Sequence, residues 1–146
     1  MNPRQAWEQG REILNELGLG GWALGFDRAK RRAGACHYAR QMITLSEHFV
    51  SMNDWDEVRI TILHEAAHAL TPNDRGHGWE WKAKCRELGI APERCYGEDV
   101  AMPEGSIRIM CPNHGQIGTR HRMPKRGLVY RCKRCKEPVK HLRAYQ

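Results

Sequence analysis

The sequence predicts an α+β protein in two parts, a body of helices and strands over residues 1–104 and a small β-rich module over residues 105–146. Three observations lead to this prediction. The stretch ITILHEAAHAL (60–70) is nearly all apolar yet holds two histidines and a glutamate. Closely spaced Cys and His residues occur near the C-terminus, and the balance of charge changes at about residue 105.

The chain has 146 residues, which is enough for one compact core with a small appended module. Its net charge is +7, but residues 105–146 hold eleven Lys and Arg against one acid, and the preceding residues hold thirteen against sixteen acids. A basic module commonly meets a polyanion, although a merely soluble surface would show a similar excess.

Targeting signals are not evident in the sequence. No apolar run approaches the roughly 20 residues that span a bilayer, and the first ten residues lack the apolar core of a signal peptide. We therefore expect an intracellular protein of the cytoplasm, nucleoid or nucleus that is not secreted, does not bind a membrane and is a monomer. Disulfides are not expected there, and Cys36 and Cys85 are interpreted as small buried hydrophobes.

The body is expected to begin with a helix from Pro3 to about Leu17, where Trp7, Ile13 and Leu14 fall near one face and Gly18 ends the helix. Three short runs follow, at 22–26, 33–38 and 42–46, separated by charged or small residues. They predict a three-strand meander.

A second helix is expected from Asn53 or Asp54, either of which can cap it, to about Leu70, before Pro72. Residues 71–78 are rich in Pro, Asn, Asp and Gly and predict a loop. A third helix is expected over 79–88, and residues 90–105 read as an irregular linker.

The motif H64-E-A-A-H68 has the spacing of a metal site. Four residues advance a helix by about 40° beyond one turn, so both imidazoles project from one face and can bind one zinc ion. Glu65 lies about 100° around the helix, where it can take a proton from a water activated by the metal without being a ligand. Such a trio in a buried helix is costly unless it is paired, which favours metal binding over a chance match.

A catalytic zinc usually has three protein ligands, and His77 is the next candidate downstream. Gly76 and Gly78 permit a tight turn that carries its imidazole back over the helix, although a loop histidine can equally be solvated. No oxyanion stabiliser is evident; Tyr96 is a weak possibility and is more simply structural.

H64-E-A-A-H68 followed by G76-H-G-W-E-W81 resembles the SprT-like family of zinc metalloproteases, which includes Spartan. The resemblance implies a zincin-like metalloprotease body with His64, His68 and His77 as zinc ligands and Glu65 as the general base. It also implies a helix, a meander, the active-site helix, a further helix and a C-terminal zinc ribbon, and substrates bound or crosslinked to DNA. Trp79 departs from the proline that is common in the family, and Trp81 matches its usual aromatic residue.

The C-terminal module contains C111-P-N-H114 and C132-K-R-C135, two pairs of metal ligands separated by seventeen residues. This spacing predicts one structural zinc held by Cys111, His114, Cys132 and Cys135. His121 and Cys95 remain alternatives for the fourth ligand, because the first pair is C-x₂-H.

The basic residues around these ligands predict sequence-independent DNA binding, since nothing in the module resembles a recognition helix. The alternative is a catalytically silent DNA-binding or regulatory zinc protein. The residues expected to contact DNA are Arg120, Arg122, Lys125, Arg126, Arg131, Lys133, Arg134 and Lys136.

Overall fold

The computed structural model describes residues 1–93 and 101–143 and divides the chain into two compact units, Met1–Pro103 and Glu104–Gln146. The first unit has the helices α1 (Pro3–Glu16), α2 (Glu47–Met52), α3 (Trp55–Leu70) and α4 (Trp79–Glu87) and the strands β1 (Ala23–Asp27), β2 (Gly34–His37) and β3 (Met42–Ser46). The second unit has β4 (Ile107–Cys111), β5 (Gly115–Arg120) and β6 (Lys140–Arg143). The mixed α+β class expected from the sequence is confirmed.

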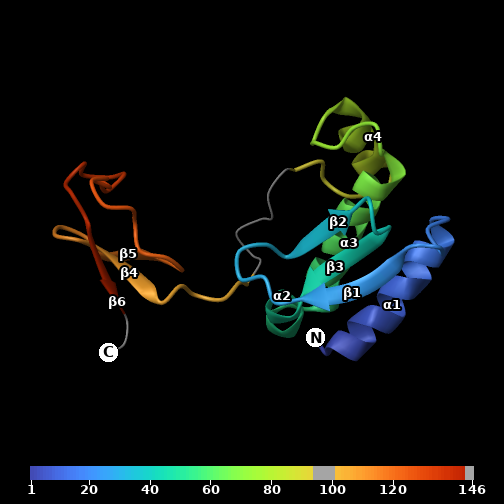
Figure 1. The fold of residues 1–146 in the computed structure, drawn as a ribbon, viewed down its shortest axis with the longest axis horizontal. Coiled ribbons are helices and arrows are strands. Elements are labelled where there is room, and N and C mark those ends of the chain that lie inside the picture. Colours follow the sequence, from blue (N-terminus) through green and yellow to red (C-terminus); the bar gives the residue numbers. More distant parts are fainter. Residues whose placement is uncertain (94–100, 144–146) are drawn as a thin grey trace. The chain divides into compact units, whose positions relative to one another are not determined.

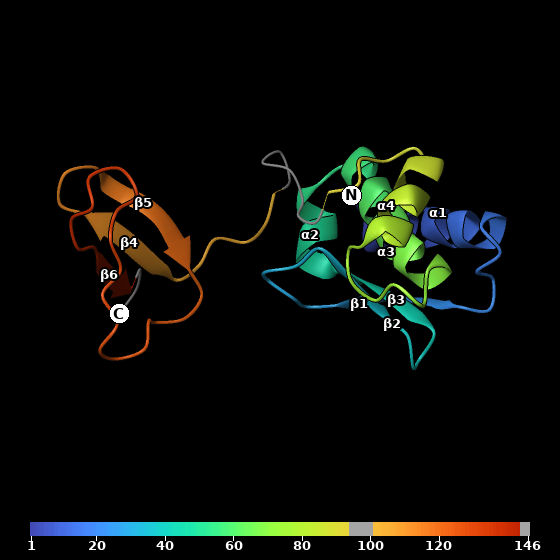
Figure 2. The same cartoon turned by 90° about the horizontal axis from the view of Figure 1, so that it is seen from above.

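The first unit is a sheet covered on one face by helices, with α3 against the sheet and α4 beyond it (Figures 1 and 2). One core cluster joins α1, α3 and the sheet through residues such as Leu14, Ile43, Leu45 and Ile62, all fully buried. Trp7 was expected on the buried face of α1, but it is 43% exposed, and its indole Nε1 donates a hydrogen bond to the Leu24 carbonyl.

The strand order of the first sheet is β1-β3-β2, with β1 parallel and β2 antiparallel to β3. The predicted meander, in which β2 would be central, is therefore wrong. Ile43 and Leu45 are both fully buried, so β3 takes the central position, whereas β1 and β2 carry glycines that contribute little to packing. As a result β2 lies at an edge of the sheet.

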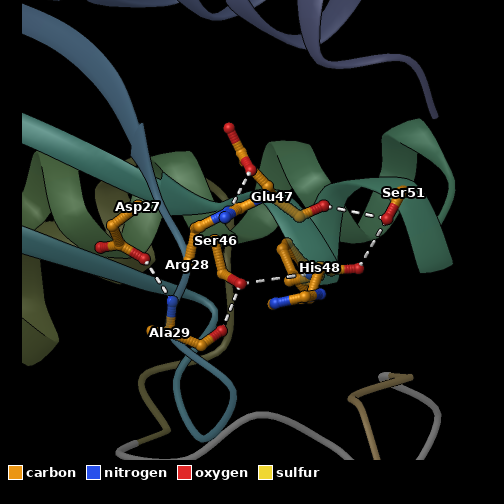
Figure 3. A network of polar contacts seen from close by, with 8 residues as sticks. Asp27, Arg28, Ala29, Ser46, Glu47, His48 and Ser51 are labelled. Atoms are coloured by element: carbon orange, nitrogen blue, oxygen red, sulfur yellow. Dashed lines mark hydrogen bonds and ion pairs between the residues drawn. The ribbon is translucent and has the colours of Figure 1, made fainter.

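The connection from β1 to β2 crosses to the far edge of the sheet and is fixed at the end of β3 (Figure 3). Ser46 Oγ donates to the Ala29 carbonyl, and the Ser46 amide donates to the Ala33 carbonyl. The same Ser46 hydroxyl caps α2 by accepting from the Phe49 amide, at 3.3 Å. Helix α2 was not expected, because six residues are too few to show a helical period.

The second helix predicted from the sequence, from Asn53 or Asp54 to about Leu70, corresponds to α3. Asp54 caps it by accepting a hydrogen bond from the Glu57 amide, at 3.2 Å. Asp56 and Glu57 lie in its first turn, where their negative charges interact favourably with the positive end of the helix dipole. The second unit is an antiparallel sheet of order β5-β4-β6, in agreement with a small β-rich module. No helix in the described part of the chain is long and apolar enough to cross a membrane.

Candidate functional site

Helix α3 carries three polar side chains in its most buried stretch. His64, Glu65 and His68 are 8, 7 and 8% exposed, and every residue from Thr61 to Ala69 is buried. The helix is buried because it packs on the sheet through one face and on α4 through another. Two imidazoles and a carboxylate in such surroundings lose much hydration, so the structure must compensate for it locally.

The loop that carries His77 is held by Asp74, a residue that the sequence analysis missed. The Asp74 carboxylate accepts hydrogen bonds from the amides of Gly78, at 3.2 Å, and Trp81, at 3.1 Å, and so caps α4. These hydrogen bonds, that from Trp81 foremost, lower the pKa of Asp74. A Cβ at position 78 would lie 2.6 Å from Asp74 Oδ2, so a side chain there would displace the carboxylate from its capping position. The sequence did contain a signal for this role, because Asp74 precedes a helix whose N-cap residue, Gly78, has no side chain to cap it.

The rings of three histidines lie around the indole of Trp81. Its ring is 1% exposed, and the ring centroids of His77, His68 and His64 lie 4.6, 5.2 and 5.7 Å from its own. The rings of His68 and His77 also contact each other, with centroids 4.9 Å apart. Trp81 Nε1 donates to the His64 carbonyl, at 3.3 Å, which fixes the indole against α3. The loop histidine therefore meets the helix histidines over one buried indole.

The imidazoles of α3 are kept in the form that binds metals. Burial, followed by the neighbouring His77 and His64, lowers the pKa of His68 to about 4, and burial lowers the pKa of His64. Metal binding requires neutral imidazoles. His68 Nδ1 is buried and has no hydrogen-bond partner among the described residues, while His64 Nε2 lies 3.3 Å from the Ala91 carbonyl oxygen. The two histidines of α3 are therefore in the protonation state that a metal ligand requires.

Glu65 lies beneath the edge strand β2. A Cβ at Gly34 would lie 3.3 Å from Glu65 Cγ and 3.0 Å from Thr61 Cγ2, so the strand passes very close to α3. Cys36, two residues along, has its pKa raised to about 12, first by burial and then by the charge of Glu65. The edge strand thus forms one wall around the glutamate. Tyr96 lies outside the described residues.

The second unit brings Cys111, His114, Cys132 and Cys135 together, with all four donor atoms within 4.8 Å of one another. Sγ of Cys111 lies 3.5 Å from Sγ of Cys135 and 3.5 Å from Nδ1 of His114, which is 3.6 Å from Sγ of Cys132. In a tetrahedral site with Zn–S bonds of about 2.3 Å, neighbouring sulfurs lie about 3.8 Å apart. The four residues therefore fit a metal ion.

Asn113 supports this cluster from within the first ligand pair. Its amide donates to Cys111 Sγ, and its side chain donates to Cys135 Sγ, each at 3.4 Å. The second of these bonds is the main cause that lowers the pKa of Cys135 to about 6, so this cysteine favours the thiolate that binds metals. His121 does not join the cluster, and Cys95 lies outside the described residues.

The two clusters differ in how tightly their donor atoms are gathered. Among the described residues, only the group in the second unit has at least three possible metal-ligand atoms that all lie within 4.8 Å of one another. The histidines of the first unit are brought ring against ring over Trp81 but do not reach that spacing together.

The basic residues expected to contact DNA surround the second cluster. Arg120 is half-buried, with its guanidinium 5.1 Å from the ring centroid of Tyr130, which is 39% exposed. No ion pair is found within the described part of this unit, so no acid neutralises these side chains there. The exposed members are Arg122, Lys125, Arg126, Arg131, Lys133, Arg134 and Lys136.

The fold and the two clusters define a mixed α+β protein with a histidine cluster on a central helix and a separate Cys/His cluster in a small β unit. The chain belongs to the SprT-like family, whose model matches residues 10–99. This match includes all of α3 and the loop of His77.

Several bacterial proteins are similar to this chain. Protein SprT of Pseudomonas putida is 30% identical over 125 residues, which cover 78% of this chain and 76% of that protein. Protein SprT of Pseudomonas aeruginosa is 29% identical over 118 residues, covering 73% and 72%. The crystal structure of the metallopeptidase zymogen jannalysin of Methanocaldococcus jannaschii covers 65% of this chain and 85% of that chain, with 17% identity and a TM-score of 0.49.

Proposed function

We propose that this protein is a zinc-dependent endopeptidase that is recruited to DNA and cleaves proteins bound or crosslinked to it. The observation that carries the proposal is that His64, Glu65 and His68 lie in the buried stretch of α3, with the ring of the loop residue His77 against that of His68. A glutamate of 7% exposure next to His64 on the same helix is the kind of base that hydrolysis of an amide needs.

His64, His68 and His77 would hold the zinc ion, and the lowered pKa values of His64 and His68 favour it. When bound, zinc supplies Lewis acidity toward water and toward the carbonyl of the substrate. Glu65 takes one proton from the water as its oxygen forms a bond to the carbonyl carbon. Glu65 then gives this proton to the leaving nitrogen as the C–N bond breaks, so the products are a carboxylic acid and an amine.

The substrate backbone would lie along β2. This strand is at the edge of the sheet and passes directly over Glu65, with Gly34 closest. An extended peptide can pair with such an edge through main-chain hydrogen bonds, which depend little on side-chain identity. A protease recruited by tethering needs little sequence preference, since tethering raises the local concentration of its substrates.

The second unit would hold a structural zinc through Cys111, His114, Cys132 and Cys135. A unit of about 40 residues buries few large apolar side chains and depends on such a ligand to fold. Its exposed arginines and lysines lie around that centre and have no acidic partner among the described residues of this unit. They support binding to the phosphates of DNA without sequence preference.

The proposal is tested by digestion of a basic DNA-binding protein with the zinc-loaded protein, with and without DNA, beside Glu65→Gln. Glu57→Gln makes the same chemical change in the first turn of α3 and serves as the control. We expect cleavage that DNA stimulates, that salt suppresses and that Glu65→Gln abolishes without loss of zinc.

Cleavage that survives in Glu65→Gln would show that the proposed base is wrong. No cleavage by the wild type, with zinc and DNA both bound, would favour a catalytically silent DNA-binding protein. DNA affinity that does not fall steeply with salt would contradict the phosphate contacts.

A further inference from the structure

Tyr38 carries a buried hydroxyl that the fold does not use. Its oxygen is shielded from water and has no hydrogen-bond partner among the described residues. A buried polar group without a partner costs free energy, and such groups in native proteins often mark functional sites. Phenylalanine would fill the same space without this cost, so the hydroxyl calls for an explanation beyond packing.

Tyr38 is the first residue of the turn that follows the edge strand β2, and the charge of Glu65 reaches its hydroxyl. Side chains two residues apart in a strand share a face, and Gly34 is in contact distance of Glu65 Cγ. Cys36 follows on the same face, and Tyr38 comes directly after β2. The charge of Glu65 acts on both: burial first, and then this charge among others, raises the pKa of each side chain.

The loop that carries His77 reaches Tyr38 from the other side. The guanidinium of Arg75, two residues before His77, lies 4.9 Å from the centroid of the Tyr38 ring. This contact is a cation–π interaction, which holds the ring in place without using the hydroxyl. Tyr38 therefore bridges the edge strand, the glutamate on α3 and the histidine loop, the three parts between which the substrate would lie.

We propose that the Tyr38 hydroxyl donates a hydrogen bond to the carbonyl oxygen of the scissile amide as negative charge develops there. This inference rests on the proposed peptidase function. As the water oxygen bonds to the carbonyl carbon, the π electron pair moves onto the carbonyl oxygen and the water proton goes to Glu65. Tyr38 keeps its proton throughout, since the raised pKa of its phenol keeps it protonated at neutral pH.

The test compares Tyr38→Phe with the wild type and with Thr61→Val, all zinc-loaded. Thr61 offers a matched control, because its hydroxyl is also buried without a hydrogen-bond partner in the described part of the chain and lies one turn before Glu65 on α3. The substrate is a fluorogenic peptide taken from a cleavage site found in the protein digest. Loss of one donor to a developing oxyanion lowers kcat by a factor of about 100 to 1,000.

We expect Tyr38→Phe to lower kcat by roughly that factor with KM nearly unchanged, and Thr61→Val to lower neither. Zinc content should stay the same, and the melting temperature of the zinc-free protein should stay the same or rise, because the orphan hydroxyl is gone. A phosphonamidate analogue of the peptide, which mimics the tetrahedral intermediate, should bind Tyr38→Phe more weakly by a factor similar to the loss in kcat/KM.

Wild-type kcat in Tyr38→Phe would overturn the inference, whereas a loss of kcat accompanied by a matching loss of zinc or of melting temperature would not separate catalysis from folding. In the latter case 3-fluorotyrosine at position 38 gives a second test, since it acidifies the phenol with little change in size. The alkaline limb of the kcat/KM profile should then move to lower pH, and an unchanged profile would again refute the role. Activity that is absent in the wild type, or retained in Glu65→Gln, would instead refute the proposed function itself.

Discussion

Replacement of Trp81 by alanine tests whether the indole supports both the core and the histidine cluster. Trp81 is 1% exposed and contacts the rings of His64, His68 and His77. A buried aromatic side chain removes about 150–250 Å² from water, or about 4–6 kcal/mol at 25 cal/mol per Å², which is an upper bound. Observed losses for such truncations are about 3–5 kcal/mol. We expect Trp81→Ala to lower the free energy of unfolding of the first unit by that amount.

Trp81→Phe separates the two contributions of the indole. It keeps an aromatic ring in the cluster but loses the hydrogen bond from Nε1 to the His64 carbonyl, worth about 1 kcal/mol, and leaves a smaller void. We expect a cost of about 2 kcal/mol. Urea unfolding of the zinc-free protein, followed by circular dichroism at 222 nm, reports on the first unit because the described helices all lie there.

Trp81→Ala also has a consequence for metal binding. Without the indole, water reaches His68, and the pKa of its imidazole rises from about 4 toward its ordinary value of 6.5. Protons then compete with zinc, so the zinc affinity of Trp81→Ala should fall more at pH 6 than at pH 8.

For the unfolding experiments, a loss below about 1 kcal/mol in Trp81→Ala, or equal losses in the alanine and phenylalanine variants, would refute the expected role of the indole in the core.

Two further predictions concern pH and the second unit. Because the pKa of His68 is lowered to about 4 in the folded protein, the unfolded chain takes up the proton first as pH falls below 6.5. Through this group the zinc-free protein should lose about 3 kcal/mol of stability between pH 6.5 and 4. Urea unfolding at several pH values measures this loss, and the free energy of unfolding should change less with pH in His68→Gln than in the wild type. An equal dependence on pH in the two proteins would contradict the prediction. If the second unit holds zinc as proposed, Cys135→Ser should remove one zinc ion per chain and disorder that unit, measured by zinc release and by amide NMR spectra, whereas Cys36→Ser should leave the zinc content unchanged.

The sequence predicted those features whose cause is local. The spacing of His64 and His68 places two imidazoles on one face of any helix, and the pairs around Cys111 and Cys132 form tight turns of their own. The caps follow the same logic, as Asp54 shows at the start of α3. In each of these cases the relevant contact is made within about four residues.

Features that depend on competition between distant segments were not predictable in this way. The order of the strands depends on which one fills the centre of the sheet, and Ile43 and Leu45 decided it against the simpler meander. Asp74 acts through amides up to seven residues away, across a loop whose path the composition does not specify. Tyr38 comes to Glu65 only through the register of an edge strand that the meander would have placed in the centre of the sheet.

The close approach of β2 to α3 links these long-range features to the local motif. A Cβ at Gly34 would lie 3.0 Å from Thr61 Cγ2, 3.1 Å from the Thr44 carbonyl oxygen and 3.3 Å from Glu65 Cγ. A Cβ there would require these neighbours to give way by a few tenths of an ångström, so the absence of a side chain permits the close approach. In the proposed mechanism the motif on α3 supplies the reactive groups, while a glycine 31 positions before Glu65 permits the close approach of the edge strand that leads to Tyr38.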